Sequence, residues 1–155
     1  MSRLSLHALA VGVATASLSL SAQAATEISW WHAMGGQLGE ILEGITEDFN
    51  QSQDEYQVTP SYRGTYAETM TGAIAAFRAN EQPHILQVFE VGTGTMMNAK
   101  GAIYPVYELM EEHGRAFDNE AFLPAVVGYY TDTNGNMLSF PFNSSTPIMY
   151  YNRDV

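Results

Sequence analysis

Cysteine is absent from this 155-residue sequence, and basic residues are scarce, with six lysines and arginines against 17 aspartates and glutamates. Without cysteine, the chain cannot be a small scaffold held together by disulfides. The net charge of −11 disfavours nucleic acid and anionic lipid surfaces as partners, because like charges repel. Solubility is the simplest explanation of this acidity, although local donors can still hold an anionic ligand.

The patterns of metal sites and of catalytic serines are also missing. The four histidines lack the spacing of metal ligands. Ser144 and Ser145 lie outside any Gly-x-Ser-x-Gly motif, which is the usual context of a nucleophilic serine. We therefore expect no metal, no cofactor and no enzymatic activity.

One long uncharged apolar run is present, at residues 4–20, after a basic start at Arg3. Serines, Thr15 and His7 dilute this run, whereas a membrane-spanning helix needs about 20 strongly apolar residues. Ala22-Gln23-Ala24 then supplies a small-x-small cleavage site. We expect residues 1–24 to be a cleaved secretory signal peptide rather than an uncleaved anchor.

Strand and helix patterns alternate after residue 25. Strands are predicted at residues 28–31, 56–62 and 85–91, the last of them covered on both faces. The first helix is predicted from apolar residues at helical spacing, namely Leu38, Ile41, Leu42, Ile45 and Phe49. Thr65-x-x-Glu68 is a capping box that predicts the start of the second helix. This alternation predicts an α/β unit with parallel strands and right-handed crossovers.

The remainder of the chain is less regular. Gly92-Thr93-Gly94 is expected to begin a short third helix through residues 95–99. Residues 103–110 are expected to be a strand-like entry into a helix, and residues 121–130 a further helix-rich segment. Asn134-Gly135 predicts a hairpin turn that joins residues 128–130 to 137–140. A last strand is predicted at 148–151, and because no stop signal follows it, we expect the chain to be part of a longer protein.

Polar and aromatic residues gather after the predicted strands. Because the carboxyl ends of parallel strands meet at one edge of a sheet, we expect these residues to ring one crevice. Aromatic faces, hydroxyls, backbone N–H groups and one carboxylate suit a polyol or a sugar-like ligand. The residues lie at positions 30–32, 62–66, 90–94 and 143–147.

Each of these positions also has a structural interpretation. Trp30, Trp31 and His32 can plug the rim of the sheet, and a structural hydrogen bond is the commoner role for such a histidine. Tyr66 can pack on the apolar face of its helix. Glu90 is harder to explain in this way, because a carboxylate that ends a buried strand must be hydrogen-bonded or paired.

Long ordered blocks of the sequence are shared with a known family. They are Trp31-His32-x-Met34, Ser61-Tyr62-Arg63-Gly64-Thr65-Tyr66, Gly72-x-Ile74-Ala75-Ala76-Phe77-Arg78, Ile85-Leu86-Gln87-Val88-x-Glu90-Val91-Gly92-Thr93-x-Thr95-Met96-Met97 and Pro141-Phe142-Asn143-Ser144-Ser145-Thr146-Pro147. From residue 28 to 154 the chain resembles the periplasmic sn-glycerol-3-phosphate-binding proteins of bacterial ABC importers.

The resemblance implies a periplasmic-binding-protein-like fold, the two-lobed Venus flytrap, with residues 25–155 forming part of the N-terminal lobe. Tyr66, Glu90 and Ser145 fall on ligand-contacting positions of the family. Glu90 would accept hydrogen bonds from the glycerol hydroxyls, and the hydroxyls of Tyr66 and Ser145 would reach the phosphate. The resemblance also gives three candidates for the pocket rim, Trp31, His32 and Ser144.

The resemblance further implies that the protein captures sn-glycerol-3-phosphate in the periplasm and delivers it to permease subunits of the inner membrane. Glycerophosphodiesters are a further class of ligand to consider. Ligand would stabilise a closed form by bridging two lobes. The sequence departs from the family in length, so the second lobe and its phosphate-binding arginine are absent. Three alternatives stay open: an oligosaccharide-binding protein, a secreted hydrolase with Glu90 as general acid, and a purely structural secreted domain.

Overall fold

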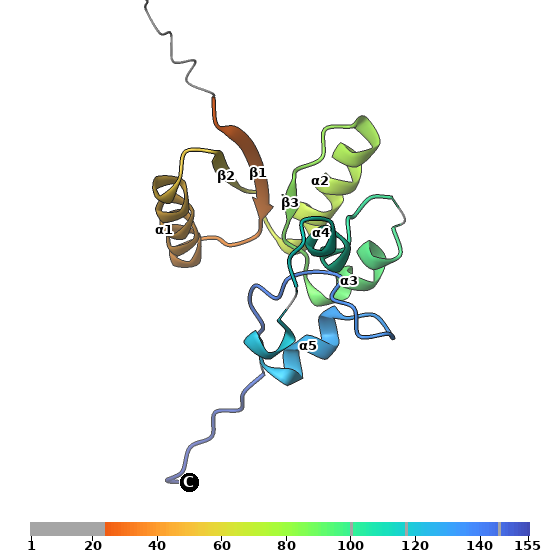
Figure 1. Cartoon of the computed structure of the whole chain (residues 1–155). Helices are drawn as coiled ribbons and strands as arrows, with labels where there is room; N and C mark the ends of the chain where they lie inside the picture. The colour runs from red at the N-terminus through yellow and green to blue at the C-terminus, as the bar shows by residue number, and fades with distance from the viewer. Residues whose placement is uncertain (1–23, 100, 117, 146) are drawn as a thin grey trace, which may run out of the picture.

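The computed structural model describes residues 24–99, 101–116, 118–145 and 147–155 (Figure 1). The expected signal peptide, apart from its last residue, lies outside the described residues. The first part of the fold consists of β1 (Thr26–His32), α1 (Gln37–Ser52), β2 (Tyr56–Tyr62), α2 (Tyr66–Ala79) and β3 (Ile85–Leu86). The second part consists of α3 (Glu90–Met97), α4 (Val106–Glu112), the 3-10 turn η1 (Asn119–Ala121) and α5 (Pro124–Tyr130).

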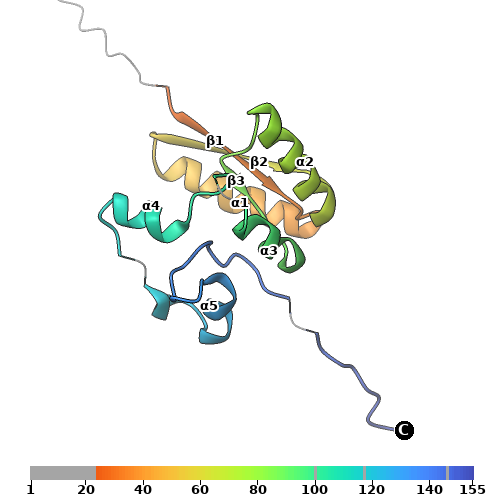
Figure 2. The same cartoon turned by 90° about the vertical axis from the view of Figure 1, so that its right-hand side faces the viewer.

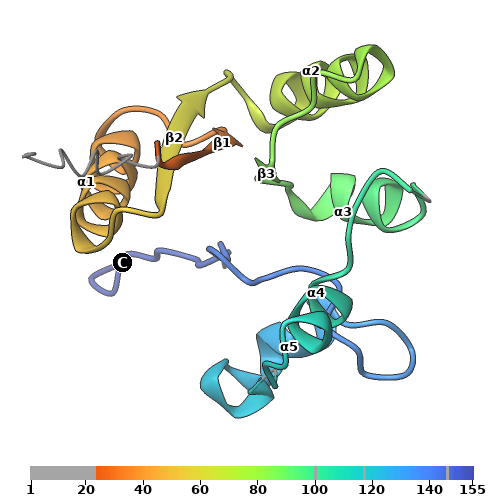
Figure 3. The same ribbon diagram turned by 45° about the horizontal axis from the view of Figure 1, so that its top comes forward.

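The three strands form one parallel sheet in the order β2-β1-β3. Along β1, Thr26 pairs with Tyr56 and His32 with Tyr62, while Trp30 pairs with Ile85 on the other side. The connection through α1 runs from β1 to β2, and the connection through α2 runs back in the opposite direction, from β2 past β1 to β3. Right-handed crossovers that run in opposite directions place their helices on opposite faces of a sheet. Accordingly, α1 and α2 lie on either side of the sheet (Figures 1 and 3). The predicted α/β class, with a parallel sheet flanked by helices, is confirmed.

Helix α1 buries a different face from the one that its apolar pattern predicts. The expected residues Leu38, Ile41, Ile45 and Phe49 are 45–59% exposed, and of the predicted face only Leu42 is buried. The residues that meet the sheet instead are Gly39, Leu42, Thr46 and Asn50.

Contacts at the two ends of α1 explain this rotation. A Cβ on Gly39 would lie 2.9 Å from the carbonyl oxygen of Met34, so only glycine permits the close approach there. Near the other end, the Asn50 side chain donates to the Val58 carbonyl and accepts from the Val58 N–H, both at 2.8 Å. The buried face therefore has the expected spacing but is shifted by one residue, which is about 100° around the helix.

The capping box at the start of α2 is confirmed. The Glu68 N–H donates to Oγ1 of Thr65 at 3.3 Å, and the Thr65 N–H donates to the Glu68 carboxylate at 2.7 Å. The Thr65 N–H and the Thr65 hydroxyl both donate to the ionised carboxylate of Glu68, and these two hydrogen bonds lower its pKa. Within α2, Ala73 is buried at 5% exposed, whereas Phe77 is 40% exposed.

The third strand is much shorter than predicted, because β3 ends at Leu86 and α3 already begins at Glu90. The predicted third strand begins at Ile85 as expected, but its end at residue 91 and the predicted helix start at 92–94 are wrong. Gly92, in the first turn of α3, packs closely against α2, since a Cβ at this position would lie 2.6 Å from Sδ of Met70.

The predicted hairpin is present only as a turn. One antiparallel bridge joins Thr131 to Met137, and the Leu138 N–H donates to the Tyr130 carbonyl at 2.9 Å. Residues 128–130 belong to α5, which agrees with the helix-rich segment predicted at 121–130 and not with the hairpin strand. This helix begins with Pro124, at a position where proline suits a helix. Gly135 has φ of 86°, as the turn requires.

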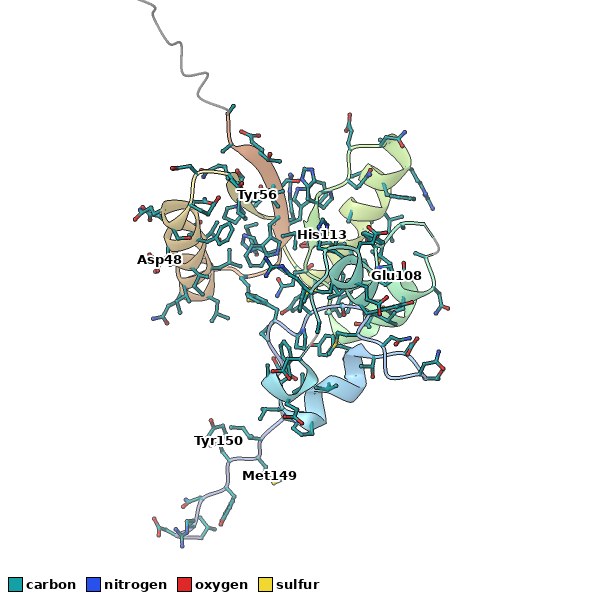
Figure 4. The ribbon with its side chains drawn as sticks, viewed as in Figure 1. Asp48, Tyr56, Glu108, His113, Met149 and Tyr150 are labelled. Atoms are coloured by element: carbon teal, nitrogen blue, oxygen red, sulfur yellow. The ribbon has the colours of Figure 1, made fainter. Side chains whose placement is uncertain are left out.

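The predicted last strand at 148–151 is not formed. The segment is extended and exposed, and the side chains of Met149 and Tyr150 are both 89% exposed (Figure 4). A strand needs a neighbour for its backbone groups, and no described strand lies beside this one. The segment leads away from the helices α3 to α5 (Figure 2). Among the described helices, none has the length and hydropathy needed to cross a membrane.

Candidate functional site

The carboxyl ends of the three strands bring the predicted positions together at one edge of the sheet. The Arg63 N–H, just after β2, donates to the His32 carbonyl at 2.9 Å, and the Gln87 N–H, just after β3, donates to the Trp31 carbonyl at 2.9 Å. Strands β1 and β3 are neighbours whose chain connections run to opposite sides, which makes this edge a topological switch point. Such switch points are where open α/β sheets bind ligands.

The two tryptophans of β1 face different ways. The guanidinium of Arg63 lies 4.0 Å above the ring of Trp31, and a Cβ on Gly72 would lie 3.9 Å from that ring, so Trp31 packs toward α2. Trp30, on the opposite face, meets the ring of Phe142 edge to face, with centroids 5.4 Å apart. Residue 142, although distant in sequence, therefore lies against the sheet edge.

His32, expected at the pocket rim or in a structural role, is 2% exposed. Its Nδ1 accepts a hydrogen bond from the Met34 N–H at 3.3 Å, so its proton is on Nε2 when the ring is neutral. Burial lowers the pKa of His32, because a charged imidazole loses its hydration there. The ring also contacts Tyr62, with centroids 6.1 Å apart. These contacts fit the structural interpretation, in which His32 supports the rim from beneath.

Tyr66 is the first residue of α2 and is partly exposed. Its ring stacks on that of Phe89, with centroids 5.6 Å apart and an angle of 23° between the planes. Because Phe89 directly precedes α3, this stack joins the start of α2 to the start of α3. It thus places the predicted ligand residues Tyr66 and Glu90 on neighbouring helix starts.

Glu90 lies at the first position of α3 rather than at the end of a strand. A carboxylate in the first turn of a helix is favourable, since the helix dipole is positive at that end. The placement of Glu90 therefore has a structural explanation that the sequence did not suggest.

Ser144 and Ser145 are exposed and belong to a segment without regular secondary structure. The residue before them, Asn143, accepts a hydrogen bond from Nε2 of Gln87 at 3.1 Å. The structure thus brings the serine segment to the same edge as the β1 and β3 loops. Among the described residues, Ser145 and Tyr66 are not joined by a hydrogen bond.

Three residues that hold this edge together were not among the sequence candidates: Gln87, Phe89 and Phe142. The signal for Gln87 was available, since it is a polar residue inside an otherwise apolar run and such residues need hydrogen-bond partners when buried. The sequence contains no comparable signal for the two phenylalanines, because an apolar ring does not indicate which part of the protein it packs against.

Two surface hollows lie elsewhere. One hollow of about 490 Å³ is lined by Tyr107 of α4 and by Asn136 and Met137, which belong to the turn after α5. The other, of about 510 Å³, lies between α1 and β2 around Asn50 and Pro60. The described lining of neither hollow includes Tyr66 or Ser145. Within the described part of the chain, acidic residues and histidines form no cluster that could hold a metal ion.

Comparison with known proteins gives strong matches to curated sequences, while no family model matches. A protein of Rhizobium meliloti is 52% identical over 137 residues, which are 88% of this chain and 32% of that protein. A protein of Agrobacterium fabrum is 46% identical over 155 residues, 100% of this chain and 36% of that protein. A protein of Yersinia pestis is 48% identical over 153 residues, 97% of this chain and 35% of that protein.

All three relatives carry the name sn-glycerol-3-phosphate-binding periplasmic protein UgpB. The chain spans about a third of the length of these proteins. The resemblance seen in the sequence blocks is thereby confirmed. Over about a third of their length, this chain is homologous to the sn-glycerol-3-phosphate-binding periplasmic proteins.

Proposed function

We propose that this protein is the solute-binding component of an ABC importer and that it holds sn-glycerol-3-phosphate at the carboxyl edge of its sheet. The observation that carries the proposal is the similarity, over nearly the whole chain, to relatives named for that ligand. The meeting of four separate loops at a topological switch point supports it.

In this proposal Tyr66, Glu90 and Ser145 contact the ligand. Glu90 accepts hydrogen bonds from the glycerol hydroxyls, and the hydroxyls of Tyr66 and Ser145 donate to the phosphate. Trp31 and Ser144 lie at the rim of the pocket, and His32 supports it. The protein binds its ligand without catalysing a reaction.

Residues 25–155 would form part of the N-terminal lobe, and a second lobe would supply the opposite wall. Ligand that bridges both lobes favours the closed form, which the permease subunits of the inner membrane then recognise. Residues 1–24 would direct the protein to the periplasm and be removed there.

The proposal can be tested in a chimera in which residues 25–155 replace the region that they match in the Rhizobium meliloti relative. The ligand is titrated by calorimetry and by melting temperature, because binding to the folded state raises that temperature. Tyr66→Phe and Ser145→Ala each remove one hydrogen bond to a charged group, worth about 1.5–3 kcal/mol. We therefore expect affinity to fall by roughly 10- to 100-fold in each variant.

Tyr150→Phe is the matched control, because the Tyr150 ring is 89% exposed and the substitution should leave affinity unchanged. Glycerophosphodiesters and a neutral oligosaccharide are titrated alongside. A folded chimera that binds the oligosaccharide but not sn-glycerol-3-phosphate would overturn the proposed ligand. A folded chimera that no small solute stabilises would overturn the binding function itself.

A further inference from the structure

Gln87 uses both ends of its side-chain amide at the switch point of the sheet. The side chain is 7% exposed. Its Oε1 accepts a hydrogen bond from the Ala33 N–H at 2.9 Å, and its Nε2 donates to Oδ1 of Asn143 at 3.1 Å. One buried side chain thus links the loop after β1, the end of β3 and a segment more than 50 residues further along the chain.

The segment at 141–145 depends on few contacts. It has no regular secondary structure, and two described contacts tie it to the sheet: the Gln87–Asn143 hydrogen bond and the ring contact between Phe142 and Trp30. The ring contact is compatible with rotation and sliding of the segment. The hydrogen bond is directional, so it determines how residues 143–145 are oriented at the crevice.

We propose that Gln87 is a positioning residue that holds the Ser144–Ser145 segment in its ligand-binding orientation. This inference rests on the proposed function for its ligand, but the tether itself can be tested without ligand. Gln87 would act through Asn143 and would not touch the ligand.

The chemistry of the amide explains why glutamine suits this position. An amide offers an acceptor for Ala33 and a donor for Asn143, whereas a carboxylate offers acceptors alone. In Gln87→Glu, the Asn143 amide can turn and donate its NH₂ to the new carboxylate. In Asn143→Asp, Gln87 still donates to a carboxylate. In the double variant two carboxylates face each other, and the link is broken when both are ionised, so the variants are compared at about pH 8, where such a pair does not share a proton.

The experiment is a double-mutant cycle on these two positions. Hydrogen exchange of residues 142–145 is measured in the full chain, and affinity for sn-glycerol-3-phosphate is measured in the chimera described above. We expect small effects in each single variant. In the double variant we expect faster exchange confined to residues 142–145. We also expect its loss of affinity to be at least about tenfold greater than the two single losses multiplied together.

Gln51→Glu is the matched control, because Gln51 Nε2 donates to the Glu47 carboxylate at 3.0 Å on the exposed surface of α1. This substitution creates a similar pair of carboxylates away from the crevice, so it should change neither the exchange of residues 142–145 nor the affinity for sn-glycerol-3-phosphate. If the double variant fails to fold, Asn143→Ala removes the same bond at an exposed position. Asn143→Ala should then raise local exchange and weaken binding several-fold.

The two proposals fail in different ways. If the changes in exchange and in affinity of the double variant are no larger than the two single variants together predict, the role of Gln87 is overturned, even in a protein that binds sn-glycerol-3-phosphate. A wild-type chimera without affinity for the ligand would overturn the proposed function, while faster exchange in the double variant would still establish the tether.

Discussion

His32 occupies a position where a positive charge is unfavourable. The ring is buried beside β2, and its Nδ1 is already occupied by the Met34 N–H. Burial deprives the charged ring of its hydration, so the pKa of His32 in the folded protein is below the usual value of 6.5. The folded state holds the neutral ring, while the unfolded state takes up a proton in the ordinary range.

This difference predicts how stability depends on pH. Below about pH 6.5 the unfolded state binds a proton that the folded state does not, so stability is lost as the pH falls through the folded pKa of His32. We expect His32→Asn to weaken this dependence, because the Asn amide can still accept from Met34 and does not titrate. Urea unfolding of the full chain between pH 7.5 and 5 measures it.

His113→Asn, at the exposed end of α4, is the control for a general effect of histidine loss. It should leave the pH dependence of the wild type in place. Equal slopes in the wild type and in His32→Asn would show that protonation of His32 is not coupled to folding.

Among the elements, α1 shows most clearly how tertiary contacts decide which face of a helix is buried. Leu42 is 2% exposed, whereas Ile45, one turn away on the apolar stripe, is 57% exposed. The helical period is equally compatible with either face. The choice comes from Gly39 and Asn50, which fix the two ends of the helix against Met34 and Val58.

We therefore expect two similar truncations in α1 to differ greatly. Leu42→Ala should lower the free energy of unfolding by about 2–3 kcal/mol, because it removes buried methyl groups and leaves a cavity. Ile45→Ala should cost less than about 1 kcal/mol, because much of that side chain already meets water. Denaturant unfolding of both variants compares them, and equal losses would show that the stripe is packed after all.

Local signals predicted the elements well where they were self-contained. The Thr65–Glu68 capping box and the Asn134-Gly135 turn were both found, because each is formed by residues within four positions of one another. The length of β3 and the start of α3 were missed, because the apolar run at 85–91 carries no local signal for where the strand ends and the helix begins. The strand at 148–151 was predicted wrongly, since a short apolar run cannot by itself supply a neighbouring strand.

At the scale of the whole molecule, the sequence predicted the parallel α/β arrangement and hence the edge at which the loops meet. It also identified Trp31, His32, Tyr66 and Ser145 as candidates from their places after strands or from the resemblance. It could not show that Gln87 ties these loops together, because that link joins residues brought close by folding alone. The ligand roles of Tyr66, Glu90 and Ser145 remain predictions.

The most direct test of the crevice is a hydrogen-exchange footprint of the chimera with and without sn-glycerol-3-phosphate. We predict that ligand slows exchange near residues 66, 90–92 and 143–145, at the carboxyl edge of the sheet. Protection confined instead to the hollow between α1 and β2, or to the hollow beside α4, would contradict the account, because the ligand would then bind away from the strand ends.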